Sequence, residues 1–137
     1  MSNTDVTWPI QTAIYDTLTA DAQLDAVITG VHDEVPTDTR FPYVTIGDAS
    51  STPEGAHDRF GARSSVTLHV WSTYHGYKEA LTIVGHLMRL LDQQQAITVD
   101  GHHLVAIRHE QTVTMRDPDP DVRHAAVRFA IETEYTP

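Results

Sequence analysis

Apolar side chains recur at helical spacing near the start of the chain. Over residues 8–19 the inward positions lie three or four residues apart, at Ile10, Ala13, Ile14, Thr17 and Leu18. Pro9 stands in the first turn, where its missing N–H leaves no helical hydrogen bond unmade. Asp21 is placed to cap a second short turn that ends at Gly30. We therefore expect a helical N-terminal region over residues 8–30, with one face packed inward.

A second and clearer helical pattern covers residues 76–93. Its apolar stripe repeats at i, i+3, i+4 and i+7, through Tyr77, Leu81, Val84, Leu87, Met88 and Leu91. Gly85 lies inside this stretch and disfavours the helix by about 1 kcal/mol relative to alanine. We expect the missing side chain to allow close packing of this main helix against a sheet.

Elsewhere apolar and polar residues alternate with period two, which is typical of half-buried strands. The alternation covers residues 42–48, residues 64–72 and, near the end of the chain, residues 124–132. Asp100-Gly101 stands between two strand-like runs and is a strong hairpin signal. The C-terminal strands are therefore expected within residues 96–134, after the main helix.

This order of elements favours an α+β fold, with two helices packed on a mainly antiparallel sheet. A length of 137 residues fits a single domain over residues 1–137. No apolar run approaches the roughly 20 residues that cross a bilayer, so we expect no membrane association. The N-terminus has neither basic residues nor an apolar core, which indicates a protein that stays in the cytoplasm where it is made.

Charge and cysteine content narrow the function classes further. The chain has no cysteine, which excludes disulfides, thiolate catalysis and cysteine-type zinc sites. Nine basic residues against nineteen acidic ones give a formal net charge of -10, and the basic residues are scattered. Tight sequence-independent DNA binding needs clustered Lys and Arg, so this balance disfavours it.

The nine histidines are the main feature that points toward metal or catalytic chemistry. His102 and His103 are neighbours on a predicted strand, so their side chains point to opposite faces. His69, His109 and His124 lie on predicted strands whose neighbours the sequence does not fix. No G-x-S-x-G motif or glycine-rich phosphate loop is present. We expect no enzyme and no cofactor, with a small metal-dependent hydrolase using His and Asp residues as an open alternative.

Residues 49–63 have no hydrophobic period and are rich in Ser, Pro and Gly, so they are expected to form a long loop. A long structureless insert in a small domain is often functional. Charges of both signs accompany the apolar Phe60, a composition suited to contacts with another subunit. The candidate residues for an oligomer interface or a channel-facing loop are Glu54, His57, Asp58, Arg59, Phe60 and Arg63.

The chain resembles the tail-completion or tail-terminator proteins of long-tailed bacteriophages and phage-like particles. The resemblance lies in an ordered set of short motifs from residue 31 onward: VHDEVP, FPYVTIGD, VWS, GYKEAL, LLD and DPDPDVRHAAVRF. The positions that match are Asp33, Pro36, Phe41, Pro42, Tyr43, Asp117 and Asp119, and we expect them to shape turns and strand starts. The resemblance implies no catalytic residues.

The resemblance also implies a role and partners. Such proteins form a ring, commonly a hexamer, at the head-proximal end of the tail tube, where they stop polymerisation and meet the head-tail connector protein. The expected partners are copies of the chain itself, the tail tube protein and the connector, with DNA passing through without tight binding. The expected location is the virion tail, assembled in the host cytoplasm. A head-completion or connector protein of the same junction is the alternative within this class.

Overall fold

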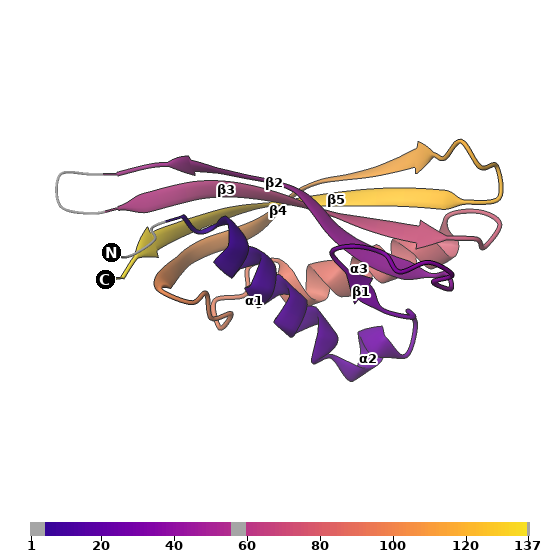
Figure 1. Cartoon of the computed structure of the whole chain (residues 1–137), viewed down its shortest axis with the longest axis horizontal. Coiled ribbons are helices and arrows are strands. Elements are labelled where there is room, and N and C mark those ends of the chain that lie inside the picture. The colour runs from indigo at the N-terminus through magenta and orange to yellow at the C-terminus, as the bar shows by residue number, and fades with distance from the viewer. Residues whose placement is uncertain (1–4, 56–59, 137) are drawn as a thin grey trace.

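The structure is a computed structural model that describes residues 5–55 and 60–136. In this part of the chain three helices and five strands follow one another (Figure 1). The helices are α1 (Thr7–Thr19), α2 (Ala22–Asp25) and α3 (Lys78–Leu91). The strands are β1 (Val31–His32), β2 (Tyr43–Pro53), β3 (Gly61–Ser72), β4 (His102–Arg116) and β5 (Arg123–Tyr135). None of the described helices is long and apolar enough to span a membrane.

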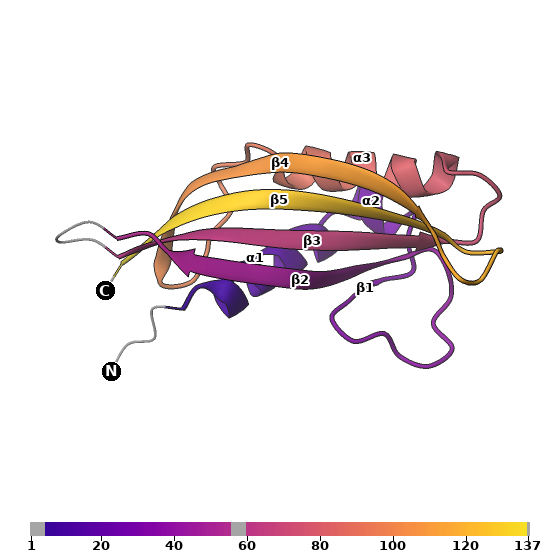
Figure 2. The ribbon, with the colours of Figure 1, turned by 90° about the horizontal axis from the view of Figure 1, so that it is seen from above.

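The strands form one sheet in the order β1-β2-β3-β5-β4. Every neighbouring pair is antiparallel except the short β1, which pairs in parallel with β2. The helices lie on one face of the sheet, and the other face is open in the described part of the chain (Figures 1 and 2). The expected α+β fold with a mainly antiparallel sheet in a single domain is confirmed.

The alternating strand patterns place their apolar side chains between sheet and helices, as predicted. The buried residues of β2, β3 and β5 are Val44, Ile46, Val66, Leu68, Val70, Ala125, Val127, Phe129 and Ile131. In the N-terminal region the Asp21 carboxylate accepts the Leu24 N–H at 2.9 Å, which confirms the predicted cap of a short second helix. That helix ends at Asp25 rather than at Gly30.

The main helix is present, but its buried face is rotated from the predicted stripe. Ala80 and Ile83 are buried, whereas Leu81 is 42% exposed. Gly85 is also exposed, and a Cβ built there would meet no described atom within 4 Å. The expected close packing of Gly85 against the sheet is therefore wrong, because this position faces away from it.

The predicted long loop over residues 49–63 is wrong as well. β2 continues to Pro53 and β3 begins at Gly61, so most of this segment is paired strand. A register shift between Gly47 and Ser50 separates the two halves of the hairpin. Beyond it Ser51 lies opposite Ser64, and their hydroxyls are 2.9 Å apart. Strand pairing and hydroxyl contacts thus order a segment whose composition alone indicates a loop.

The predicted hairpin across Asp100-Gly101 is only a turn with an isolated bridge between Val99 and His102. Gly101 has a φ of 74°, which glycine adopts without strain. The long hairpin of this region instead joins β4 to β5, and the proline-containing connection lies between Arg116 and Arg123. Proline lacks the N–H that a central strand needs, which explains why the strands break there.

Candidate functional site

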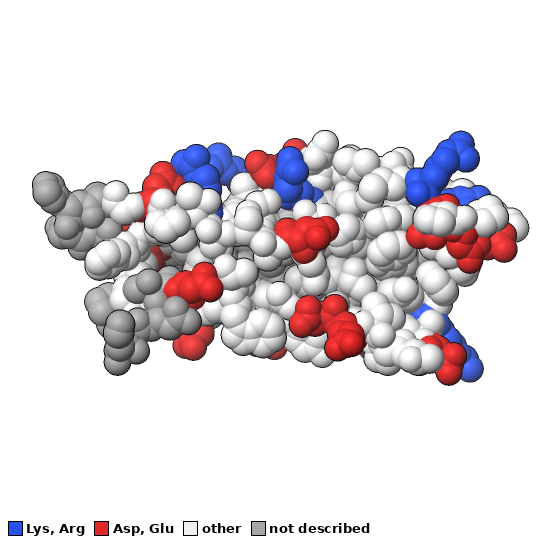
Figure 3. Space-filling model, turned by 45° about the horizontal axis from the view of Figure 1, so that its top comes forward, with Lys and Arg blue, Asp and Glu red and all other residues white. Residues whose placement is uncertain are grey.

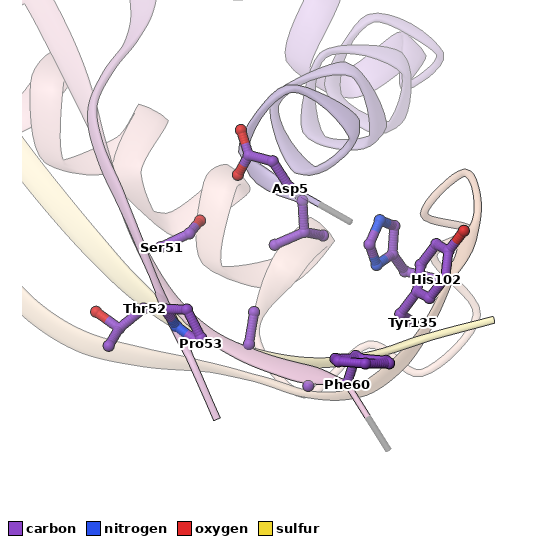
Figure 4. Close-up of a pocket in the computed structure, with 10 residues that line it drawn as sticks. Asp5, Ser51, Thr52, Pro53, Phe60, His102 and Tyr135 are labelled. Atoms are coloured by element: carbon purple, nitrogen blue, oxygen red, sulfur yellow. The ribbon is translucent and has the colours of Figure 1, made fainter. Parts of the chain in front are cut away.

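The two ends of the sheet present different groups. At one end, here called the hairpin end, the start of α1 and the end of β5 lie next to the β2–β3 hairpin (Figures 1 and 2). Its described residues that shape a surface hollow are Asp5, Val6, Ser51, Thr52, Pro53, Phe60, Gly61, Ala62, His102 and Tyr135. The hollow has a volume of about 280 Å³ and is shown in Figure 4.

Phe60 forms part of the wall of this hollow, and the residue is 67% exposed. His102 packs edge-on against Tyr135, with ring centroids 5.5 Å apart, and both line the opposite side from Ser51 (Figure 4). The Phe60 carbonyl accepts the Tyr135 N–H at 2.6 Å, which ties the hairpin to the end of β5. An exposed aromatic ring beside a partly apolar hollow is suited to contact with another protein.

The backbone beneath the hollow is closely packed. A Cβ built on Gly61 would lie 2.6 Å from the Glu54 carbonyl oxygen and 3.1 Å from that of Thr133. On the helix side, the Thr7 hydroxyl donates to Ser51 Oγ at 2.8 Å and so joins α1 to the hairpin. Small and hydroxyl-bearing residues therefore fix the position from which Phe60 projects.

Two further interface candidates form an ion pair on the hairpin. Arg63 and Glu54 lie 3.1 Å apart, with 64% and 54% of their side chains exposed. An ion pair this exposed contributes little to the stability of the fold, so both side chains remain available at the surface. Neither residue lines the hollow. His57, Asp58 and Arg59, the remaining candidates, lie outside the described residues.

Burial lowers the pKa of His102 from its ordinary value, although Asp100 and Asp5 act in the opposite direction. The folded hairpin end thus favours the neutral imidazole. His103, the other member of the histidine pair, follows on the opposite side of β4 and is exposed. The structure therefore separates the two side chains, as their adjacent positions on one strand predict.

The connection from β1 to β2 and the turn from β4 to β5 lie at the opposite end of the sheet, here called the motif end (Figures 1 and 2). These segments and the first residue of β2 hold the positions that match the family motifs: Asp33, Pro36, Phe41, Pro42, Tyr43, Asp117 and Asp119. The Phe41-Pro42 peptide is cis, and the rings of Phe41 and Tyr43 lie 5.1 Å apart. Burial raises the pKa of Tyr43, and Asp117 adds to the effect. Segments from both halves of the chain therefore meet at this end.

Hydrogen bonds within turns hold the remaining motif residues. The Asp117 carboxylate accepts the Asp119 N–H at 2.9 Å, and the Asp119 carboxylate accepts the Asp121 N–H at 2.9 Å. The Pro36 carbonyl accepts the Thr39 hydroxyl at 2.6 Å. These contacts support a structural role in shaping the turns.

Sequence reasoning missed a cluster on the open face of the sheet. His69 lies 2.8 Å from the Asp48 carboxylate through one nitrogen and 2.7 Å from His124 through the other. The His124 ring stacks on Trp71 with centroids 3.8 Å apart. Because β3 pairs with β5, the fold joins histidines that are 55 residues apart in sequence. The alternation of β3 and β5 placed both residues opposite the core, but only the strand order makes them neighbours.

The histidine and carboxylate side chains of these sites are of the kinds that can bind a metal ion. In residues 5–55 and 60–136, no three His, Cys, Asp or Glu side chains are arranged to hold a metal ion. The hydrolase alternative therefore lacks a metal centre within that part of the chain. The fold is that of a small α+β domain, with a surface hollow beside the exposed Phe60 at the hairpin end.

Comparison with known proteins identifies the family. The family model for "Tail completion protein gp17" matches residues 12–134, and the chain belongs to this family of structural tail proteins. The tail completion protein gp17 of Bacillus phage SPP1 is 28% identical over 124 residues, covering 89% of this chain and 91% of that protein. The resemblance inferred from the motifs is confirmed, as is the expected location in the virion.

Two solved structures share the fold. A chain in the virion of a native gene transfer agent particle superposes with a TM-score of 0.87 at 23% identity, covering 96% of this chain and 99% of that one. The structure of bacteriophage SPP1 gp17 gives a TM-score of 0.59 at 25% identity, covering 94% and 95%.

Proposed function

We propose that the protein forms a ring that caps the head-proximal end of the tail tube, ends tube polymerisation and joins tail to head. Membership of the tail completion family is the observation that carries this proposal. The partners are other copies of the chain, the tail tube protein and the head-tail connector. A closed ring requires heterologous contacts, in which two different surfaces of one subunit meet its two neighbours.

The hairpin end supplies one such surface. Phe60 projects beside the hollow lined by Pro53, His102 and Tyr135, and it is a large apolar residue that is 67% exposed. Aromatic side chains of this kind supply much of the binding energy at protein interfaces. The Glu54–Arg63 ion pair flanks it and adds a polar rim. We assign Phe60 as the anchor of a contact between copies.

The charge of the chain suits a channel through which DNA slides. At a net charge of -10 the protein repels a polyanion at long range. Acidic and basic side chains are interspersed over the face seen in Figure 3, where they form no continuous basic patch. A ring of such subunits would let the genome pass without the counterion release that drives tight DNA binding.

Electron microscopy of particles made without this gene tests the role. Filled heads beside unattached tubes of uncontrolled length are the expected result. Tubes of normal length with leaking or empty heads would instead identify a head-completion or connector protein. Normal infectious particles would overturn an assembly role altogether.

The assignment of Phe60 has a separate test. In native mass spectrometry with purified tail tubes as the template, Phe60→Ser should reduce ring formation at least tenfold. Leu81→Ser is the matched control, because it removes another exposed apolar side chain from α3, far from the hairpin in sequence. Ring formation by Phe60→Ser equal to that of the parent protein would remove Phe60 from the interface.

A further inference from the structure

Two arginines face each other across the last pair of the β4–β5 hairpin. Arg116 and Arg123 are Cα partners in the antiparallel register. Side chains directly opposite in such a pair have Cβ atoms about 5 Å apart, and like charges there are destabilising. This arrangement leaves two positive charges close together at the motif end, which an anion placed between them would neutralise.

Both arginines line one surface hollow at the start of α3. Its volume is about 400 Å³, and its other walls come from Gly76, Tyr77, Asp117, Pro120 and Val122. Arg123 precedes the buried Ala125 by two residues, so it lies on the helix side of β5. The Tyr77 hydroxyl donates to the Met115 carbonyl at 3.0 Å, which fixes the wall next to Arg116.

Neither guanidinium has a carboxylate partner within the described residues. Arg63, Arg89, Arg108 and Arg128 all form ion pairs there. Arg123 instead donates to the Pro120 carbonyl at 2.7 Å. Asp117 lines the same hollow, but its carboxylate accepts the Asp119 N–H in the turn. The two arginines therefore retain hydrogen-bond donors for an external anion.

We propose that Arg116 and Arg123 bind a carboxylate side chain of a neighbouring protein. Guanidinium groups bind carboxylates through paired, charge-assisted hydrogen bonds. The apolar parts of Pro120, Tyr77 and Val122 suit the short aliphatic stem of a Glu or Asp side chain. That this neighbour belongs to the tail rests on the proposed function.

A protein carboxylate fits this site better than the phosphates of DNA. A single carboxylate interacts mainly within the hollow, where the two guanidinium groups outnumber the one carboxylate, that of Asp117. A duplex would also meet the exposed Asp119 and Asp121 of the same turn and the overall charge of -10. The local pair of cations thus selects a small anion, while the surroundings reject a polyanion.

Titration of the full-length protein with sodium glutarate tests the site. The readout is the NMR signals of the Arg Nε–H groups and of the Gly76 amide, with sodium chloride holding the ionic strength constant. We expect saturable shifts at Arg116 and Arg123, and at least tenfold weaker binding in the R116Q/R123Q variant. The control R108Q/R128Q removes two positive charges from arginines that are already paired, and should bind like the parent protein.

Several outcomes would overturn the proposal. Linear, unsaturable shifts would show no site, and equal affinity in R116Q/R123Q would place the anion elsewhere. A 20-base-pair duplex that shifts the same signals saturably would make the ligand a nucleic-acid phosphate. The folded state of each variant is checked from its amide spectrum before titration.

Particle assembly provides the second arm. R116E/R123E in the parent genome should give tails of normal length that fail to join heads, and R108Q/R128Q should assemble normally. Normal particles from R116E/R123E would overturn the docking role even if glutarate binds. The deletion experiment tests the proposed function independently, because uncontrolled tube length there requires no anion site.

Discussion

The hairpin end and the motif end are ordered by different means. At the hairpin end the backbone defines the shape, since β2–β3 pairing continues to Pro53 opposite Ala62 and the backbone packs closely around Gly61. At the motif end, specific side chains define the shape through Asx-type turns, the aromatic contact of Phe41 with Tyr43, and the arginine pair. The shape of the hairpin end therefore depends on close backbone packing, and the shape of the motif end depends on the identity of particular side chains.

The largest change in the free energy of unfolding is expected from adding a side chain at Gly61, where the backbone of the hairpin end is closely packed. In Gly61→Ala the new Cβ meets the Glu54 carbonyl oxygen, a backbone atom that gives way only if the hairpin shifts. We expect a loss of about 3 kcal/mol in the free energy of unfolding, near the upper end of overpacking effects. Urea denaturation measures it.

Gly47→Ala is the matched control for this substitution. It changes the same residue type in the same hairpin, but no described atom lies within 4 Å of the added Cβ. A small change at Gly47 with a large loss at Gly61 would support close backbone packing at the hairpin end. Similar losses at both positions would indicate a general intolerance of the strands to substitution.

The next effect concerns a buried hydrogen bond at the motif end. Ser72 is fully buried, donates to the Glu79 carboxylate at 2.6 Å and accepts the Tyr74 N–H at 3.0 Å. Ser72→Ala leaves both partners without this hydroxyl, which should lower the free energy of unfolding by about 2 kcal/mol. Thermal or urea unfolding tests it.

Thr82→Ala controls for loss of a hydroxyl that bonds only within its own helix, to the Lys78 carbonyl at an exposed position. It should change stability by less than about 0.5 kcal/mol. If Ser72→Ala were equally mild, the motif end would not depend on the identity of this buried side chain, and the contrast between the ends would fail.

Sequence alone predicted the parts of the molecule that depend on hydrophobic pattern. The alternation in β3 correctly placed Val66, Leu68 and Val70 on the core side, and the alternation in β5 did the same for Phe129. The Asp21 cap followed from local chemistry in the same way, because its carboxylate lies within reach of an N–H in the next turn. Features of this kind need only a few neighbouring residues to specify them.

Other features depend on pairing that no local pattern encodes. Ser50, Ser51 and Thr52 carry little strand signal, and they are ordered because β3 provides a partner for them. The contact of His69 with His124, like the facing arginines of the β4–β5 hairpin, follows from strand order and register.

The candidate site at the hairpin end was predicted only in part. Composition indicated Phe60 as a candidate contact residue, and the structure shows that it is 67% exposed. Composition did not indicate the hollow beside it. That hollow forms where the start of α1, the start of β4 and the end of β5 meet the hairpin, so it requires four segments that are distant in sequence.

A smaller change in the free energy of unfolding, a gain rather than a loss, is expected from a substitution in α3, which lies between the two ends of the sheet. Gly85 lies in the middle of α3, is exposed, and has open space within 4 Å of a built Cβ among the described atoms. Gly85→Ala should raise the free energy of unfolding by about 1 kcal/mol, because alanine restricts the unfolded chain and favours the helix. Thermal unfolding measures the gain.

Measuring ring formation by Gly85→Ala shows whether α3 contacts a neighbouring subunit. If Gly85→Ala is more stable as an isolated chain and still forms rings, the exposed face of α3 is free of neighbours at this position. A stabilised chain that no longer forms rings would place a subunit contact on α3, away from both ends of the sheet.

The smallest expected effect is a dependence of stability on pH, to which one histidine at each end of the sheet contributes. At the motif end, burial and the neighbouring His69 lower the pKa of His124, against the opposite action of Asp117 and Asp48. At the hairpin end, burial lowers the pKa of His102. The unfolded chain then binds more protons than the folded chain below the ordinary value of 6.5, so stability falls as the pH drops below that value.

Urea midpoints between about pH 7.5 and pH 5 measure this slope in the parent protein, His102→Gln and His124→Gln. Each substitution should remove part of the slope, and the His124 variant should also lose the ring contact with Trp71 at all pH values. An unchanged slope in His124→Gln would mean that the folded motif end does not favour the neutral imidazole. If the slope of stability with pH falls in His124→Gln but not in His102→Gln, the pH response belongs to the motif end. The two ends would then differ in their response to protons as well as in the way their shapes are maintained.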